Sequence, residues 1–232
     1  MKKFCLLIML VGSGLVSAND VVDINVEVTA DAAACTPVLS NNGVADFGTR
    51  YAGSLSKTAF NQLGTRDMAL TITCESATGV AITARDARAD SMTNGKDETG
   101  TSGVKFQVNG GGYVSDASRL FGLGVTSEGK KIGSYAVQIN AATVVATDAD
   151  AEVKVDIAGA ADKSGPWTIS TMLPLPTSQD YFYTFVQKGT TTPQPIMTAS
   201  VPLQVSVAVA PDISSNQAIT LDGEAVITIA YL

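Results

Sequence analysis

Histidine is absent from this chain of 232 residues. Because histidine is the most frequent general base and metal ligand in proteins, its absence removes most familiar designs of catalytic and metal sites. The chain also has no Gly-x-Ser-x-Gly nucleophile elbow, the motif of α/β-hydrolases. Paired carboxylates remain an alternative, because they hydrolyse sugars without histidine. We expect no enzyme, no bound cofactor and no metal site.

Basic residues and long apolar runs are also scarce. The chain has 15 lysines and arginines against 22 aspartates and glutamates, a net charge of −7, and such a surface repels nucleic acid. After residue 18, no stretch approaches the roughly 18 to 20 apolar residues that a transmembrane helix needs. We therefore expect neither nucleic-acid binding nor a membrane span.

The beginning of the chain has the features of an export signal. Two lysines precede an apolar stretch at residues 4–11, and small residues that a signal peptidase accepts end at Ala18. Cleavage after Ala18 predicts a signal peptide at residues 1–18 and one elaborated domain at residues 19–232. The mature protein is expected in the periplasm or at the cell surface.

Two cysteines remain after this cleavage, Cys35 and Cys74. An oxidising compartment favours a disulfide between them, and their spacing does not match a zinc site. A bridge closing a loop of about 40 residues contributes roughly 4 kcal/mol in the chain-entropy model. The alternative, two buried free thiols, is uncommon outside the cytosol. The sequence thus predicts a disulfide bond.

Apolar and polar residues alternate along most of the mature chain, which is typical of strands with one buried face. Near the N-terminus, Val22, Ile24, Val26 and Val28 are separated by polar residues. The same alternation recurs at residues 68–74, 80–82, 104–108, 135–139, 153–157, 167–169 and 201–209.

Residues that accept positive φ lie between these stretches and predict turns. Asn41-Asn42-Gly43 and Asp222-Gly223 are of this kind. The three-four spacing of an amphipathic helix never persists. Short strands separated by such turns favour an antiparallel β-sandwich or a barrel.

The two cysteines differ in how they align with the apolar positions of the nearest alternating stretch. Cys74 has the apolar parity of residues 68–74 and is expected to point into the core. Cys35 has the opposite parity to the apolar positions of residues 22–28. A bulge or bend at residues 31–34 is therefore expected if both sulfurs face inward.

The last alternating strand, at residues 225–232, runs to the end of the chain. Ala225, Ile227, Ile229 and Tyr231 share its apolar face. A terminal strand with open backbone N–H and C=O groups is suited to pair with another polypeptide. These residues and the N-terminal alternating strand are the predicted strand-pairing interface.

Four carboxylates lie close together in the sequence. Asp148, Asp150 and Glu152 share one strand face, and with Asp156 they could act as ligands of a hard cation. They alternate with the apolar positions of the same stretch. A solvated strand face is therefore the preferred interpretation.

The densest aromatic cluster contains Tyr181, Tyr183 and Phe185. Exposed aromatic rings could bind carbohydrate or a partner protein. Their shared strand parity favours packing in the core.

Several short sequence blocks follow one another in a fixed order. They are ACTP at residues 34–37, GVADFG at 43–48, LTITC at 70–74, FGLG at 121–124, KIGSY at 131–135 and the ending at 222–232. With these blocks the chain resembles the GltF-like family of exported Gram-negative proteins, which are described as beta-fimbriae major subunits. The resemblance spans nearly all of the mature chain.

The resemblance implies an immunoglobulin-like β-sandwich and a fimbrial-type structural or adhesive subunit. In such subunits a periplasmic chaperone and then neighbouring subunits complete an open sandwich by strand pairing, and the penultimate Tyr231 matches the chaperone-pairing position. A host or surface receptor is a further implied partner. The N-terminal strand is then either a donated arm or the protein's own first strand.

The extra length of the chain and its short N-terminal arm support a second hypothesis. The sandwich is then complete by itself, and the protein is a self-contained periplasmic binding or regulatory protein of the GltF type.

Overall fold

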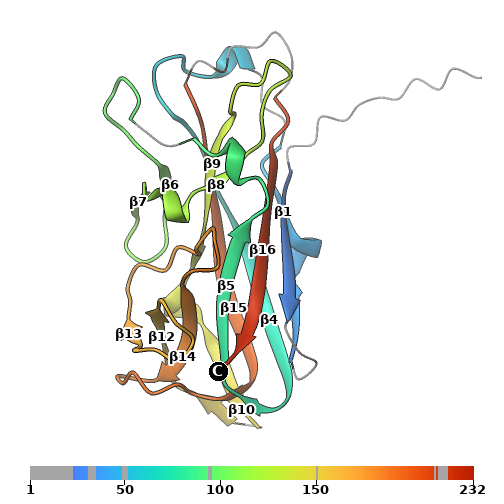
Figure 1. The fold of residues 1–232 in the computed structure, drawn as a ribbon, viewed down its shortest axis with the longest axis vertical. Helices are drawn as coiled ribbons and strands as arrows, with labels where there is room; N and C mark the ends of the chain where they lie inside the picture. Colours follow the sequence, from blue (N-terminus) through green and yellow to red (C-terminus); the bar gives the residue numbers. More distant parts are fainter. Residues whose placement is uncertain are drawn as a thin grey trace, which may run out of the picture.

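A computed structural model shows two β-sheets packed face to face with a small hairpin beside them (Figure 1). It describes residues 23–30, 35–48, 52–93, 96–149, 151–211, 213 and 219–232; the expected signal peptide lies outside these ranges. The all-β prediction is confirmed. Helical segments in the described ranges are the 3-10 turns η1 (Ser40–Gly43), η2 (Ala52–Ser54), η3 (Ala89–Ser91), η4 (Ala117–Arg119) and η5 (Ala141–Thr143). None of them is long and apolar enough to cross a membrane.

The first sheet brings the first and last described strands side by side. β1 and β16 run parallel to each other, whereas the other neighbouring strands of this sheet run antiparallel. The spatial order is β13 (Thr168–Ile169), β12 (Val155–Ala160), β14 (Phe182–Gln187), β5 (Val80–Asp86), β16 (Asp222–Tyr231), β1 (Asp23–Ala30) and β3 (Val44–Asp46).

The second sheet is built around two long antiparallel strands, β4 and β15. The spatial order is β11 (Ala151–Val153), β10 (Val145–Asp148), β15 (Ile196–Val209), β4 (Asn61–Thr78) and β2 (Cys35–Leu39), with β9 (Gly133–Ile139) also on β15 and β8 (Phe121–Gly122) on β9. A hairpin of β6 (Val104–Phe106) and β7 (Gly112–Val114) packs on Ala136 and Ala208 of this sheet.

The core lies between the two sheets and includes many of the side chains that the alternation predicts to be buried. Ile24 and Val26 of β1 are 0% and 4% exposed. Burying one such side chain stabilises the fold by roughly 1.5 to 3 kcal/mol. The same core includes Met68, Leu70, Ile72 and Cys74 of β4, Val201, Leu203, Val205, Val207 and Val209 of β15, and Ala225, Ile227 and Ile229 of β16.

A change of sheet explains the parity of Cys35. This residue begins β2 in the second sheet, whereas β1 belongs to the first. The two sheets face each other, so side chains of opposite parity from consecutive strands both reach the core. Residues 31–34, where the bulge or bend was expected, lie outside the described part of the chain.

The predictions at Asp222-Gly223 and at residues 167–169 are wrong. Asp222-Gly223 forms no turn, because both residues belong to β16. A Cβ atom on Gly223 would lie 2.7 Å from Cε1 of Tyr135, so this glycine makes room in the strand for an aromatic ring of the opposite sheet. The half-buried strand expected at residues 167–169 is reduced to the short β13, whose Ile169 is 41% exposed.

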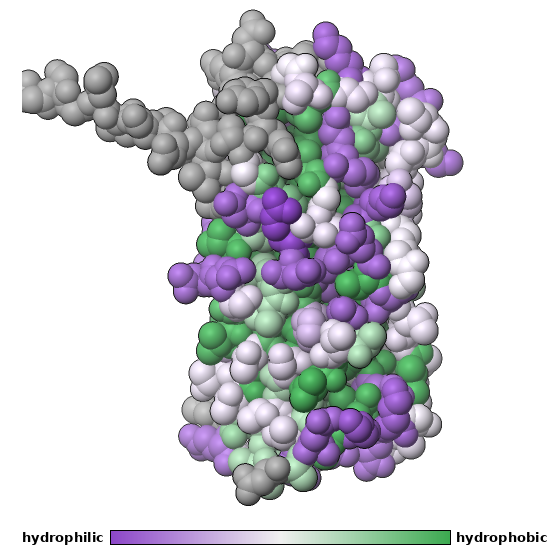
Figure 2. Space-filling view, turned by 180° about the vertical axis from the view of Figure 1, so that it is seen from behind, coloured by the Kyte–Doolittle hydropathy of each residue, from purple (hydrophilic) through white to green (hydrophobic). Residues whose placement is uncertain are grey.

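Hydrophobic and hydrophilic residues are mixed among the described residues on the face opposite to the view of Figure 1. Figure 2 shows hydrophobic residues there that are repeatedly interrupted by hydrophilic ones. Isolated exposed apolar residues are normal on soluble domains, whereas large patches mark interfaces.

Candidate functional site

The candidate site is the groove beside β16 in which β1 lies. The two strands pair in register from Asp23 opposite Asp222 to Ala30 opposite Ile229. Ile24 and Val26 point from β1 into the core, and Val28 is half-buried. β1 therefore completes the sandwich by covering apolar residues that would otherwise face water.

The structure brings the predicted interface residues together, but within one chain. Both edges of β16 are occupied, one by β1 and the other by β5 from Ala225 opposite Asp86 to Tyr231 opposite Val80. Ala225, Ile227 and Ile229 have no exposed surface, and Tyr231 is half-buried. Pairing of β16 with another chain requires β1 to leave, so the intermolecular interface remains a prediction. The remaining predicted residue, Val22, lies outside the described ranges.

The outer edge of β1 is held by little backbone pairing. β3 pairs only with residues 23–25 of β1. Beyond that point η1 approaches, and a Cβ atom on Gly43 would lie far inside contact distance of the Val26 carbonyl oxygen. Gly43 has φ +80°, and Asn41 and Asn42 each have φ 53°, which confirms the turn predicted here. Glycine at this position allows the turn to approach the β1 backbone closely.

The other end of the groove is fixed by the penultimate residue of the chain. The backbone N–H of Cys35 donates a hydrogen bond of 2.9 Å to the hydroxyl of Tyr231, linking β2 of one sheet to β16 of the other. Cys35 also lies directly opposite Cys74 on β4, and the predicted disulfide joins them. The last residue, Leu232, donates its N–H to Gly79 O at 3.1 Å. The connection that follows β1 is thus anchored at Cys35.

Sequence reasoning missed this role of the Tyr231 hydroxyl. Its partner is 196 residues away, and no local pattern reports such a contact.

Replacing Tyr231 with phenylalanine is expected to lower the free energy of unfolding by about 1 to 3 kcal/mol, because the Cys35 N–H loses its acceptor at a partly buried position. Urea unfolding measures this change, and amide exchange at Cys35 should accelerate. Tyr113→Phe is the control, since Tyr113 is 46% exposed. Equal stability of the two variants would show that the hydroxyl contributes nothing.

Charged groups surround the place where β5 ends and the neighbouring strand β16 begins. Nε of Arg88 lies 3.2 Å from Oδ2 of Asp222, and Nη1 lies 3.1 Å from Oε2 of Glu224. The carboxylate of Asp86 accepts N–H bonds from Gly122 at 2.7 Å and Arg88 at 2.8 Å. Burial nevertheless raises the pKa of Asp86. These bonds fix the start of β16 to its neighbours.

The carboxylates considered as cation ligands do not share one strand face, because Asp148 ends β10, Glu152 belongs to β11 and Asp156 belongs to β12. Glu152 pairs with Lys154, and Asp156 with Lys188. The hydrogen bond from Lys188 and then that from the Gly189 N–H lower the pKa of Asp156. Asp150 lies outside the described residues, and among those that are described no three His, Cys, Asp or Glu residues could hold a metal ion.

Residues 124–130 have the Gly-x-x-x-x-Gly-Lys spacing of phosphate-binding loops. Lys131 follows where that motif needs a hydroxyl, and the chain continues into β9 rather than a helix. The segment is a turn in which the Thr126 N–H donates to Lys130 O at 2.8 Å. Its structure therefore differs from that of a phosphate site.

Comparison with known proteins finds relatives of nearly full length. A family model described as "Protein of unknown function (DUF1120)" matches residues 24–136. The chain is 52% identical over 219 residues to "Uncharacterized protein YhcF" of Escherichia coli (strain K12), which covers 93% of this chain and 92% of that protein. It is 27% identical over 219 residues to "Protein GltF" of the same organism, covering 86% and 84%. The expected relation to GltF is confirmed, and neither name refers to a fimbria.

Proposed function

Because the chain belongs to the DUF1120 family of proteins of unknown function, its role has to be inferred from its geometry, and we propose that it is an exported, fimbrial-type structural subunit that joins other chains by exchange of β1. In this proposal a strand from one chain occupies the groove beside β16 in the next. A periplasmic chaperone and neighbouring subunits are its partners, and an adhesive contact with a surface receptor is compatible with it. No catalytic step is assigned.

The observation that supports the proposal is the placement of β1. It is the first described strand, it lies parallel to β16, and the described strand that follows it begins at Cys35 in the opposite sheet. After the expected cleavage at Ala18, such a strand would lie near the start of the chain and could leave and re-enter its groove without threading the chain through a loop. The groove offers backbone hydrogen bonds and pockets for alternate side chains, which is the chemistry of strand addition.

Mass action determines when exchange occurs. A strand from another copy makes the same contacts as the protein's own β1, so neither wins by contact energy. The tethered strand has an effective concentration in the millimolar range. A dilute solution of the purified protein is therefore expected to keep β1 in its own groove, and assembly requires a high local concentration or a partner that displaces the strand.

A covalent lock tests the proposal. Asn25 and Val44 lie opposite each other on β1 and β3, and an Asn25→Cys/Val44→Cys bridge would hold β1 in its own groove. Thr147→Cys/Glu152→Cys, a cross-strand pair between β10 and β11, is the matched control. Native mass spectrometry measures the incorporation of a synthetic peptide of residues 22–30. We expect incorporation in the wild type and in the control lock, but not in the β1 lock. Equal incorporation in both locked proteins would contradict exchange through this groove.

A second candidate is a self-contained exported module in which β1 never leaves. The observation that favours it is that both edges of β16 are occupied within the chain. Under this alternative the wild type incorporates no peptide even at millimolar concentration. The same experiment therefore separates the two candidates.

A further inference from the structure

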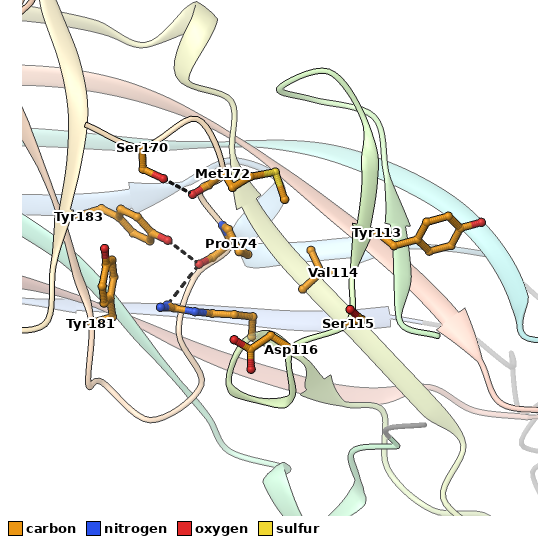
Figure 3. Close-up of a pocket in the computed structure, with 10 residues that line it drawn as sticks. Tyr113, Val114, Ser115, Asp116, Ser170, Met172, Pro174, Tyr181 and Tyr183 are labelled. Carbon is orange, nitrogen blue, oxygen red and sulfur yellow. Dashed lines mark hydrogen bonds between the residues drawn. The ribbon is translucent and has the colours of Figure 1, made fainter. Parts of the chain in front are cut away.

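A cavity of about 320 Å³ lies where β7, η4, the segment 170–174 and the start of β14 meet (Figure 3). It is separate from the groove beside β16. Its walls combine Arg119 and Asp116 of the η4 region with the apolar side chains of Met172, Pro174 and Val114. This volume is at the small end of the range of ligand sites, which runs from roughly 300 to 1,000 Å³.

Arg119 is held in place with part of its guanidinium free. The guanidinium carbon lies 4.6 Å from the centre of the Tyr181 ring. Nη1 donates to Pro174 O at 3.4 Å, and the same oxygen accepts a bond of 2.9 Å from the Tyr183 hydroxyl. The described part of the chain gives Nε and Nη2 no hydrogen-bond acceptor. A fixed guanidinium with free N–H groups is suited to bind a carboxylate.

Asp116 provides the opposite charge three residues earlier. Its Oδ1 accepts bonds of 2.9 Å from the backbone N–H and the hydroxyl of Ser118. These bonds, the backbone one first, lower the pKa of Asp116, so the carboxylate is ionised at neutral pH. No described residue donates to Oδ2. One fixed cation and one fixed anion thus border the same cavity.

The other side chains that line the cavity indicate which class of ligand fits it. Met172 is 43% exposed and forms an apolar wall with Pro174. The Tyr181 ring is covered by the Arg119 guanidinium, and Figure 3 shows the Tyr113 ring turned away from the other lining residues. A sugar would find no open aromatic face here. A doubly charged anion would meet one cation and one carboxylate.

We propose that this cavity binds a small zwitterion with an apolar side chain, that is, a neutral apolar α-amino acid. Arg119 holds its carboxylate, Asp116 its ammonium group, and Met172 and Pro174 contact its side chain. The inference depends only on the cavity and goes beyond the proposed strand exchange.

Calorimetric titration of the full chain with four probes tests the site. L-Leucine carries both charges, 4-methylpentanoate lacks the ammonium group, leucinamide lacks the carboxylate, and glucose is a polyol control. Leucine is expected to bind at least about tenfold more tightly than either singly charged probe, since a hydrogen bond to a charged group contributes this much or more. Absence of leucine binding at millimolar concentration, or tighter binding of glucose, would overturn the proposal.

Charge-removing variants separate the two contacts. Arg119→Gln should weaken leucine and 4-methylpentanoate about tenfold without affecting leucinamide. Asp116→Asn keeps an oxygen for Ser118 and should weaken leucine and leucinamide only. Arg85→Gln, at an exposed position, is the control. Where circular dichroism shows that Arg119→Gln has not folded, Asp116→Asn carries the test. Unchanged leucine affinity in a folded variant of either residue would refute the assigned contact.

Discussion

Replacing Gly43 with alanine is expected to release β1 from its groove. Two effects add at this position. The backbone has φ +80°, which costs an alanine about 1 to 2 kcal/mol. The new Cβ atom also collides with the Val26 carbonyl oxygen. Because that oxygen belongs to the backbone, no side-chain rotation relieves the contact, and β1 or η1 has to move.

The size of the effect has a natural limit. Docked β1 buries Ile24 and Val26, each contributing roughly 1.5 to 3 kcal/mol. Once the collision costs more than the docking free energy, the strand undocks and the penalty stops growing. The expected result is therefore loss of amide protection throughout β1, with protection of β4 and β15 retained. Hydrogen exchange followed by mass spectrometry of β1 peptides measures it.

Gly48→Ala provides a matched control. Gly48 has φ +67°, a similar backbone conformation, yet its Cβ position has no atom within 4 Å. The difference between the two variants isolates the contact with β1. In the exchange model, Gly43→Ala should also incorporate the 22–30 peptide faster than the wild type. Intact protection of β1 in Gly43→Ala would show that η1, not the strand, gives way.

The sequence predicts the strands of this fold better than their partners. Alternation identifies the buried face of β1, β4, β15 and β16 because side chains of a strand point alternately to its two sides. It carries no information on which strand lies beside which. Parallel pairing of β1 with β16, which brings together the first and last described strands, is visible only in the structure.

The missed features depend on contacts between distant residues. Asp222-Gly223 has the composition of a turn, but the ring of Tyr135 requires a glycine inside β16. The cavity beside η4 combines Arg119 with Tyr181, and the sequence pattern places Tyr181 only in an aromatic cluster with no indication of Arg119 beside it. Cys35 and Cys74 were predictable as a pair because they are the only two cysteines after the expected signal peptide, which leaves one simple pairing.

Breaking the Cys35–Cys74 disulfide is expected to produce the largest loss of stability. The bridge closes a loop with a sequence separation of 39 residues, so its removal costs about 4 kcal/mol in the chain-entropy model. With an m-value of roughly 2 kcal/mol per molar urea, the unfolding midpoint should fall by about 2 M. Urea unfolding of the wild type with and without a reductant measures this change.

The Cys35→Ala/Cys74→Ala variant is the control for effects of the reductant itself. It should unfold close to the reduced wild type and be insensitive to reduction. The loss should also reach beyond β2, because the bridge fixes the Cys35 N–H that donates to Tyr231 in the opposite sheet. The destabilisation caused by Tyr231→Phe is accordingly expected to shrink when the disulfide is absent. A double-mutant cycle measures this coupling, and strict additivity would mean that the two sheets are joined at this end independently of the bridge.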